Sequence, residues 1–216
     1  MPSQNLLPFR AAAVLAFHDA CLMRPDWPAQ DQAVRDGLPS GQLAEVWEWV
    51  LVNHRFNCSL WAEEDLARRT MASDADIAAN KRNIDRFNQA RNDAMERIDD
   101  ALLKLTQDWP RNPQARLSSE TAGAMIDRLS ILSLKVHHMG LQTIRTDVDA
   151  THRQTMSARH QQLQTQRNDL AGCLDRLFDE LSEGRGFFRI YRQFKMYNDP
   201  KLNPALVAEG KARAQG

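Results

Sequence analysis

One arginine lies where the buried side of a helix is expected. Over residues 83–105 the apolar residues gather on one side of a helix at about 100° per residue, and Arg91 falls in the middle of that side. A charge buried without a partner is unfavourable by several kcal/mol. Its guanidinium therefore needs a carboxylate, an anionic ligand, or a path by which its head group reaches water. We expect either a structural ion pair or a polar binding site around Arg91.

Polar side chains that share faces with apolar ones on three predicted helices are candidates for this site. On the Arg91 helix, the edge of the apolar face carries Asp85, Asn88, Asn92, Glu96 and Asp99. An earlier helix combines aromatic and polar residues on one stripe, which includes His54, Asn57, Trp61, Asp65 and Arg68. A later helix carries Glu120, Asp127 and His138 along one line and Arg128 and Lys135 along the next. Asp127 is the expected partner of Arg91.

These residue types indicate a pocket for an anion. Guanidinium and ammonium groups bind phosphate or carboxylate, and imidazole or carboxylate groups transfer protons. The candidates for proton transfer are His54, Asp85, Glu96 and Asp127. The candidates for ligand binding are Asn57, Trp61, Arg68, Asn88, Arg91, Asn92, Glu120, Arg128 and Lys135. The set suits a phosphorylated small molecule such as a sugar phosphate or nucleotide sugar, bound and, if the protein is an enzyme, transformed.

Two alternatives stay open beside this prediction. The same residues would form a structural network in a non-enzymatic interaction or accessory protein. Glu63-Glu64 and Glu96-x-x-Asp99 also partly match the paired carboxylates that bind magnesium in all-α nucleotide pyrophosphohydrolases. The first half of that pattern is incomplete, so we assign no metal ligands and keep Mg²⁺ as an alternative cofactor. Phosphate loops and the HExxH, CxxC and GxSxG motifs are absent from the sequence.

The amino-acid composition limits the kinds of partner that the protein is expected to bind. The 216 residues include 28 basic and 28 acidic ones, so the net charge favours neither nucleic acid nor an anionic membrane surface. No stretch approaches the roughly 20 apolar residues of a membrane span. The three cysteines are far apart in the sequence, which argues against a disulfide framework and predicts the cytoplasm. The apolar run before Cys21 contains Arg10 and His18, so we expect a helix of the mature protein rather than a signal peptide.

Helices must position the candidate residues, because no segment shows the period of two that a strand requires. Proline and glycine divide the chain into an N-terminal helix and four longer ones, expected at about 40–69, 73–108, 118–140 and 143–183. Ser73 is the expected cap of one helix, and Ser118 or Ser119 of the next, with Glu120 in its first turn. The predicted fold is all-α, a single bundle of about five helices with an extended C-terminal strap.

The predicted domain organisation follows from these breaks. Residues 1–39 form a helix and linker that pack on the bundle, 40–205 form the helical-bundle domain, and 206–216 form a flexible tail. The polar stretch at about 145–165 is the expected surface for a protein partner or a second copy. A short sequence repeat, in which Arg91-Asn-Asp recurs as Arg167-Asn-Asp, suggests that two of the long helices have equivalent positions.

Four ordered motifs resemble the bacterial family known as domain of unknown function 4254. They are HxxNxxxWxEEDxxR (54–68), KRxIDxxNQxRND (81–93), SETxGxxIDRLSILxLK (119–135) and YRQFKMYNDP (191–200). The resemblance covers about residues 40–205. Members of that family are often encoded near glycosyltransferases and other cell-envelope polysaccharide genes, so the resemblance implies a role there. It implies no catalytic residues, because the family is uncharacterised.

Overall fold

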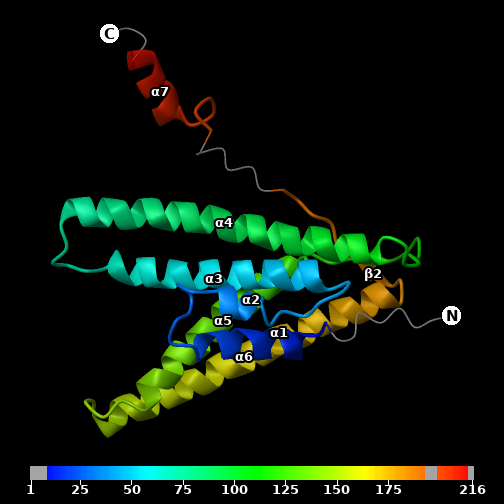
Figure 1. The fold of residues 1–216 in the computed structure, drawn as a ribbon, viewed down its shortest axis with the longest axis horizontal. Helices are drawn as coiled ribbons and strands as arrows, with labels where there is room; N and C mark the ends of the chain where they lie inside the picture. Colours follow the sequence, from blue (N-terminus) through cyan, green and yellow to red (C-terminus); the bar gives the residue numbers. More distant parts are fainter. Residues whose placement is uncertain (1–8, 193–198, 214–216) are drawn as a thin grey trace.

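The computed structural model describes residues 9–192 and 199–213, and within them the chain is an all-α protein (Figure 1). The helices are α1 (Ala11–Leu22), α2 (Gln32–Arg35), α3 (Ala44–Leu66), α4 (Asp74–Thr106), α5 (Ala122–Thr143), α6 (Ala150–Ser182) and α7 (Pro204–Arg213). Two short strands, β1 (Arg116–Leu117) and β2 (Gly186–Phe187), pair in parallel. The predicted fold class is confirmed, and this strand pair is the addition that the sequence did not indicate.

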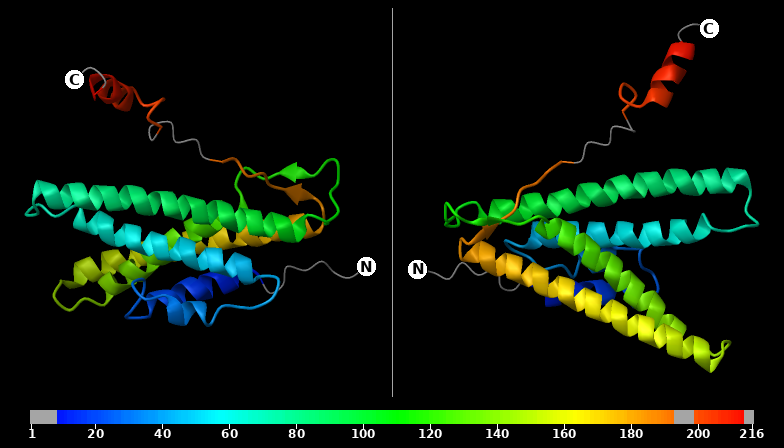
Figure 2. Two further views of the ribbon diagram at one scale, coloured as in Figure 1. Left: turned by 45° about the horizontal axis from the view of Figure 1, so that its top comes forward. Right: turned by 180° about the vertical axis from the view of Figure 1, so that it is seen from behind.

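Two long hairpins form the bundle. Helices α3 and α4 lie side by side, and α5 and α6 form a second hairpin whose closed end diverges from the first (Figures 1 and 2). Helix α1 packs along the second hairpin. The core lies where α1 and the two hairpins meet, and its fully buried members include Phe9, Val50, Ile98, Ile126 and Leu174. Periodic apolar residues on each long helix supply this core, as the amphipathic pattern predicted.

The caps explain where the helices begin. Ser73 caps α4 as predicted, since its Oγ accepts from the backbone N–H of Asp76 at 3.1 Å, and the Asp76 carboxylate accepts in return from Ser73 N–H. Helix α5 begins later than predicted, because Thr121 is its cap. Ser118 instead extends the strand pair, and its N–H donates to the carbonyl of Phe187 at 2.8 Å. Glu120 therefore precedes the helix rather than lying in its first turn.

The C-terminal segment is partly extended and partly helical. Arg192 ties the described part of the strap to α4, since its guanidinium donates to Glu96 at 2.8 Å and to Asp100 at 2.7 Å. Residues 193–198 of the predicted strap lie outside the described residues. The prediction of a flexible tail from residue 206 contrasts with α7, a helix over most of that segment. Asn203 Oδ1 accepts from the Ala205 N–H at 2.9 Å, which starts the helix with proline at its first position.

The first copy of the sequence repeat lies on α4, and its side chains contact α5. Arg91 Nε lies 3.7 Å from Asp127 Oδ1. About two turns further along α4, Asp99 Oδ1 accepts from the Gly123 N–H at 2.6 Å and so satisfies the first turn of α5.

The second copy of the sequence repeat lies on α6, and its side chains contact α1 in the same way. Arg167 donates to Asp19 Oδ1 at 2.7 Å, and Asp175 Oδ1 accepts from the Ala11 N–H at 2.9 Å at the start of α1. In both helices the arginine pairs with a neighbouring helix and the aspartate caps the beginning of that same neighbour.

Candidate ligand-binding site

Asp127 is the centre of a buried polar cluster between α3, α4 and α5. Its Oδ1 accepts from the side-chain amides of Asn53 and Asn57, both at 2.9 Å, and lies 3.7 Å from Arg91 Nε. Asp127 is therefore the partner of Arg91, as predicted, but the contact is longer than a hydrogen bond. Arg91 also donates to Asn92 Oδ1 at 3.0 Å. Its buried Nε has no hydrogen-bond partner among the described residues.

The cluster continues from Asn57 to a core histidine. Asn57 Nδ2 donates to Ser130 Oγ at 3.0 Å, and His54 Nδ1 lies 2.8 Å from the same oxygen. The His54 ring stacks on His18 with centroids 4.4 Å apart and on Trp27 at 5.6 Å. Burial lowers the pKa of His54 to about 3, so the ring is neutral at physiological pH and anchors the network.

Two members of this cluster, Asn53 and Ser130, were not predicted from the sequence. Asn53 precedes Asn57 by one helical turn on α3, and Ser130 follows Asp127 by nearly one turn on α5. Residues at that spacing share a helix face. The spacing alone could have identified both as neighbours of predicted site residues.

A cavity of about 530 Å³ opens beside the cluster, between α3, α4 and α5. We call it the Arg91 pocket, and its lining residues are Asn57, Leu60, Trp61, Glu64, Asp65, Arg68, Ile84, Asn88, Arg91, Ile131 and Leu134. Five of the residues predicted to bind a ligand line it: Asn57, Trp61, Arg68, Asn88 and Arg91. The structure therefore brings together a large part of the set that helix periodicity selected.

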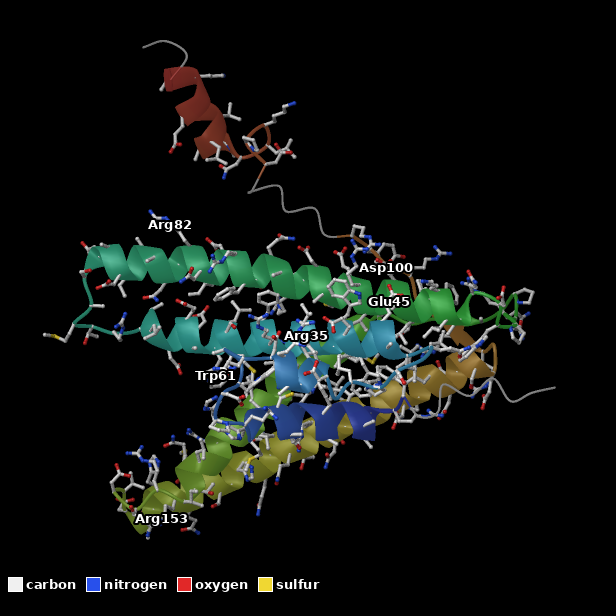
Figure 3. All side chains as sticks on the ribbon, in the orientation of Figure 1. Arg35, Glu45, Trp61, Arg82, Asp100 and Arg153 are labelled. Atoms are coloured by element: carbon white, nitrogen blue, oxygen red, sulfur yellow. The ribbon has the colours of Figure 1, made fainter. Side chains whose placement is uncertain are left out.

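One wall of the Arg91 pocket is aromatic, and the charged residues that line the pocket include both acidic and basic ones. Trp61 stacks on His138 with ring centroids 4.6 Å apart and parallel planes, and it lies on the side of α3 that faces the second hairpin (Figure 3). Arg68 is exposed and pairs with Glu64 at 2.7 Å. Arg91 is half-buried, with 23 % of its side chain exposed, and it is the cation that lies deepest in this pocket.

Three other predicted ligand-binding residues lie elsewhere. Arg128, Lys135 and Glu120 line a second cavity of about 900 Å³ between α5 and α6, and Arg128 pairs with Glu120. The structure therefore does not bring Arg91, Arg128 and Lys135 together around one cavity, as the prediction required. Helix α5 is apolar around most of its circumference, so the sequence did not show which of its faces points toward α4.

The residues predicted to transfer protons do not meet in a cavity. Asp85 is exposed and pairs with Lys81, and Glu96 accepts from Arg192. His54 and Asp127 belong to the buried cluster, and none of the four lines the Arg91 pocket. Among the described residues, no group of three or more His, Cys, Asp and Glu side chains is arranged to hold a metal ion. The carboxylates that line the Arg91 pocket are instead those of Glu64 and Asp65.

The buried histidines predict that stability falls in acid. Burial lowers the pKa of His54 to about 3 and that of His18 well below its usual range, so the unfolded chain binds protons first as the pH drops below about 6.5. Burial raises the pKa of Asp99 to about 6. The folded chain therefore binds one proton at Asp99 that the unfolded chain does not, and this offsets the proton that one of the two histidines binds in the unfolded chain. Between about pH 6 and 4 we expect a net loss of about 1.4 kcal/mol per pH unit in the free energy of unfolding.

Urea unfolding at a series of pH values measures this slope. His18→Phe keeps a ring against His54 and removes one titrating group, so its slope over the same range should be close to zero. An unchanged slope in this variant would show that His18 is protonated in the folded protein.

The protein is thus an all-α bundle with a cavity of mixed polar and apolar lining between three helices. The chain belongs to the family described as protein of unknown function (DUF4254), whose model matches residues 47–190. This match contains every residue that lines the Arg91 pocket. No curated protein and no solved structure matches the chain. Among the described residues, no helix combines the length and the apolar character needed to cross a membrane.

Proposed function

We propose that the protein binds a phosphorylated small molecule, such as a sugar phosphate or nucleotide sugar, in the Arg91 pocket. The incomplete pairing of Arg91 carries the proposal. Asp127 lies 3.7 Å from Arg91 Nε and already accepts hydrogen bonds from Asn53 and Asn57. Arg91 lines the cavity, and its guanidinium makes one hydrogen bond to the described residues, from Nη2 to Asn92 Oδ1 at 3.0 Å. Phosphate oxygens accept strong, charge-assisted hydrogen bonds from such a group.

The remaining lining suits a ring that carries hydroxyl groups. Asn57 and Asn88 offer amide donors and acceptors, and Asp65 offers a carboxylate that accepts from a hydroxyl group. Trp61 presents a flat apolar wall that His138 holds in place. Leu60, Ile84, Ile131 and Leu134 add further apolar surface, and a concave site that combines apolar walls with polar groups is typical of small-molecule sites.

The biological setting is part of the proposal. A cytoplasmic protein that acts in cell-envelope polysaccharide metabolism meets phosphorylated sugars and nucleotide sugars there. Binding is the activity that the arrangement supports, and a chemical step is not assigned to any residue. The second candidate is an accessory protein in which the polar cluster is structural, and the complete burial of His54 favours that alternative.

A thermal-shift screen tests the proposal. The panel contains inorganic phosphate, glucose 1-phosphate, UDP-glucose, UMP, unphosphorylated glucose and MgCl₂. A ligand at about 100 times its Kd stabilises the native state by about 2.7 kcal/mol, which raises Tm by about 5–10 °C in a protein of this size. We expect such a rise for a phosphorylated compound and none for glucose.

Two arginine variants locate the binding site. Arg91→Gln should abolish most of the rise, whereas Arg128→Gln should keep it, because Arg128 lines the other cavity. If no phosphorylated compound raises Tm, the accessory role is the correct one. An equal rise in both variants would place the ligand outside the Arg91 pocket.

A further inference from the structure

A long groove follows the outer side of the second hairpin. It is the cavity of about 900 Å³, and each residue that lines it comes from α5, α6 or the segment 116–120. We call it the α5–α6 groove. Its floor is apolar and consists of Met125, Ile131, Leu132, Leu170, Cys173 and Leu177. Helices α1, α3 and α4 supply none of its lining residues, so other parts of the described chain leave the groove open.

The charges around this groove do not converge on one point. The rim carries four basic and three acidic side chains, namely Arg116, Arg128, Lys135, Arg176, Glu120, Asp169 and Glu180. Two internal ion pairs, Arg128–Glu120 and Arg116–Glu180, neutralise part of the rim. A small-molecule site gathers its polar groups to orient one ligand, whereas an apolar centre surrounded by a polar rim of both signs is typical of a protein interface.

Three rim charges, Lys135, Asp169 and Arg176, lie outside these two ion pairs, and Arg176 donates to Cys173 Sγ at 3.2 Å. Lys135 on α5 and Asp169 on α6 are exposed and have no ion-pair partner among the described residues. A two-fold contact places the same surface on both partners, so each unpaired lysine can meet the unpaired aspartate of the other copy. The surface is therefore complementary to itself.

The overall charge of the chain allows such a contact. The 28 basic and 28 acidic residues give no net charge at pH 7, so two copies approach without long-range repulsion. A strongly basic or acidic partner would gain little from a rim whose charges nearly balance. Two antiparallel hairpins that pack through one face each also form a four-helix arrangement, which is a common way to bury apolar helix faces.

We propose that the α5–α6 groove is the interface of a two-fold homodimer, in which Lys135 of each copy pairs with Asp169 of the other. Sedimentation velocity on the full chain tests the oligomeric state. We expect a species of twice the 24.7 kDa chain mass at protein concentrations up to about 100 µM. A protein that remains monomeric over this range would overturn the proposal.

The rate at which Cys173 reacts with a thiol reagent shows whether the groove is the dimer interface. It lies half-buried in the groove, whereas Cys21 and Cys58 are buried, and burial raises the pKa of both of these thiols to about 12. A maleimide reagent should therefore label Cys173 first. Its labelling rate should fall as the protein concentration rises and dimer forms. A dimer in which Cys173 reacts as fast as in the monomer would use a different face.

Substitutions on the groove separate its apolar and charged contributions. Leu132→Glu should weaken dimerisation at least about 30-fold, and Leu141→Glu, at an exposed position of the same helix outside the groove, should not change it. Lys135→Glu and Asp169→Lys should each weaken the dimer about tenfold. The double variant restores opposite charges across the interface and should recover the wild-type affinity. A double variant as weak as either single one would contradict the proposed pairing.

Discussion

Replacing Asp127 with alanine should lower the free energy of unfolding by about 3–5 kcal/mol. The carboxylate accepts from two buried asparagine amides and lies beside the Arg91 guanidinium. Its removal takes the shared acceptor from the Asn53 and Asn57 amides and leaves the Arg91 guanidinium without its counter-charge, and both changes are unfavourable in a buried cluster. Urea unfolding followed by circular dichroism measures the change.

A second pair of variants checks that charge and hydrogen bonding both contribute. Asp127→Asn retains an oxygen acceptor and should lose less stability than Asp127→Ala. Arg91→Met leaves the carboxylate without its cation, so adding Asp127→Asn to it should give a double variant that loses less than the sum of the single effects. Additive effects would mean that Arg91 and Asp127 do not act as a pair.

Replacing Gly123 with alanine should lower the free energy of unfolding by about 3 kcal/mol or more. A Cβ at this position would lie 2.3 Å from the backbone oxygen of Met95 and 2.9 Å from the Asp99 carboxylate. The Met95 oxygen belongs to the backbone of α4, so the clash is relieved only if α4 and α5 move apart. That movement would also break the bond from the Gly123 N–H to Asp99.

Gly172 is a matched control on α6. A Cβ there has nothing within 4 Å, and alanine is favoured over glycine inside a helix by about 0.5–1 kcal/mol. Gly172→Ala should therefore stabilise the protein slightly. If Gly123→Ala and Gly172→Ala have the same effect, α4 and α5 do not approach as closely as the structure shows.

The periodicity of apolar residues predicted much of the bundle and part of its site. Arg91 on the apolar side of its helix required a carboxylate. Asp127 was the acid in the middle of the most apolar helix, whereas Glu120 was expected at its start, so the pairing with Asp127 followed from elementary electrostatics. The polar stripe that contains Asn57, Trp61 and Arg68 likewise predicted one wall of the Arg91 pocket. Each of these predictions depended on one helix face and one strong physical preference.

The sequence was less informative where several faces or distant segments decide the outcome. Arg128 and Lys135 lie close to Asp127 on a helical wheel, yet they face the α5–α6 groove, because the rotation of α5 depends on how all its neighbours pack. Thr121 caps α5 in place of the predicted Ser118 or Ser119, because the preceding residues form β1. That strand pairs with β2, nearly seventy residues further along the chain. Long-range pairing of two-residue strands leaves no periodic signal in a sequence.

The most direct test of the ligand site is a calorimetric titration of the phosphorylated compound that raises Tm most. A charge-assisted hydrogen bond contributes about 1.5–3 kcal/mol, so the account predicts that Arg91→Gln raises Kd at least about tenfold and that Arg128→Gln leaves Kd unchanged. Equal dissociation constants for the wild type and Arg91→Gln would contradict the assignment of the Arg91 pocket as an anion-binding site.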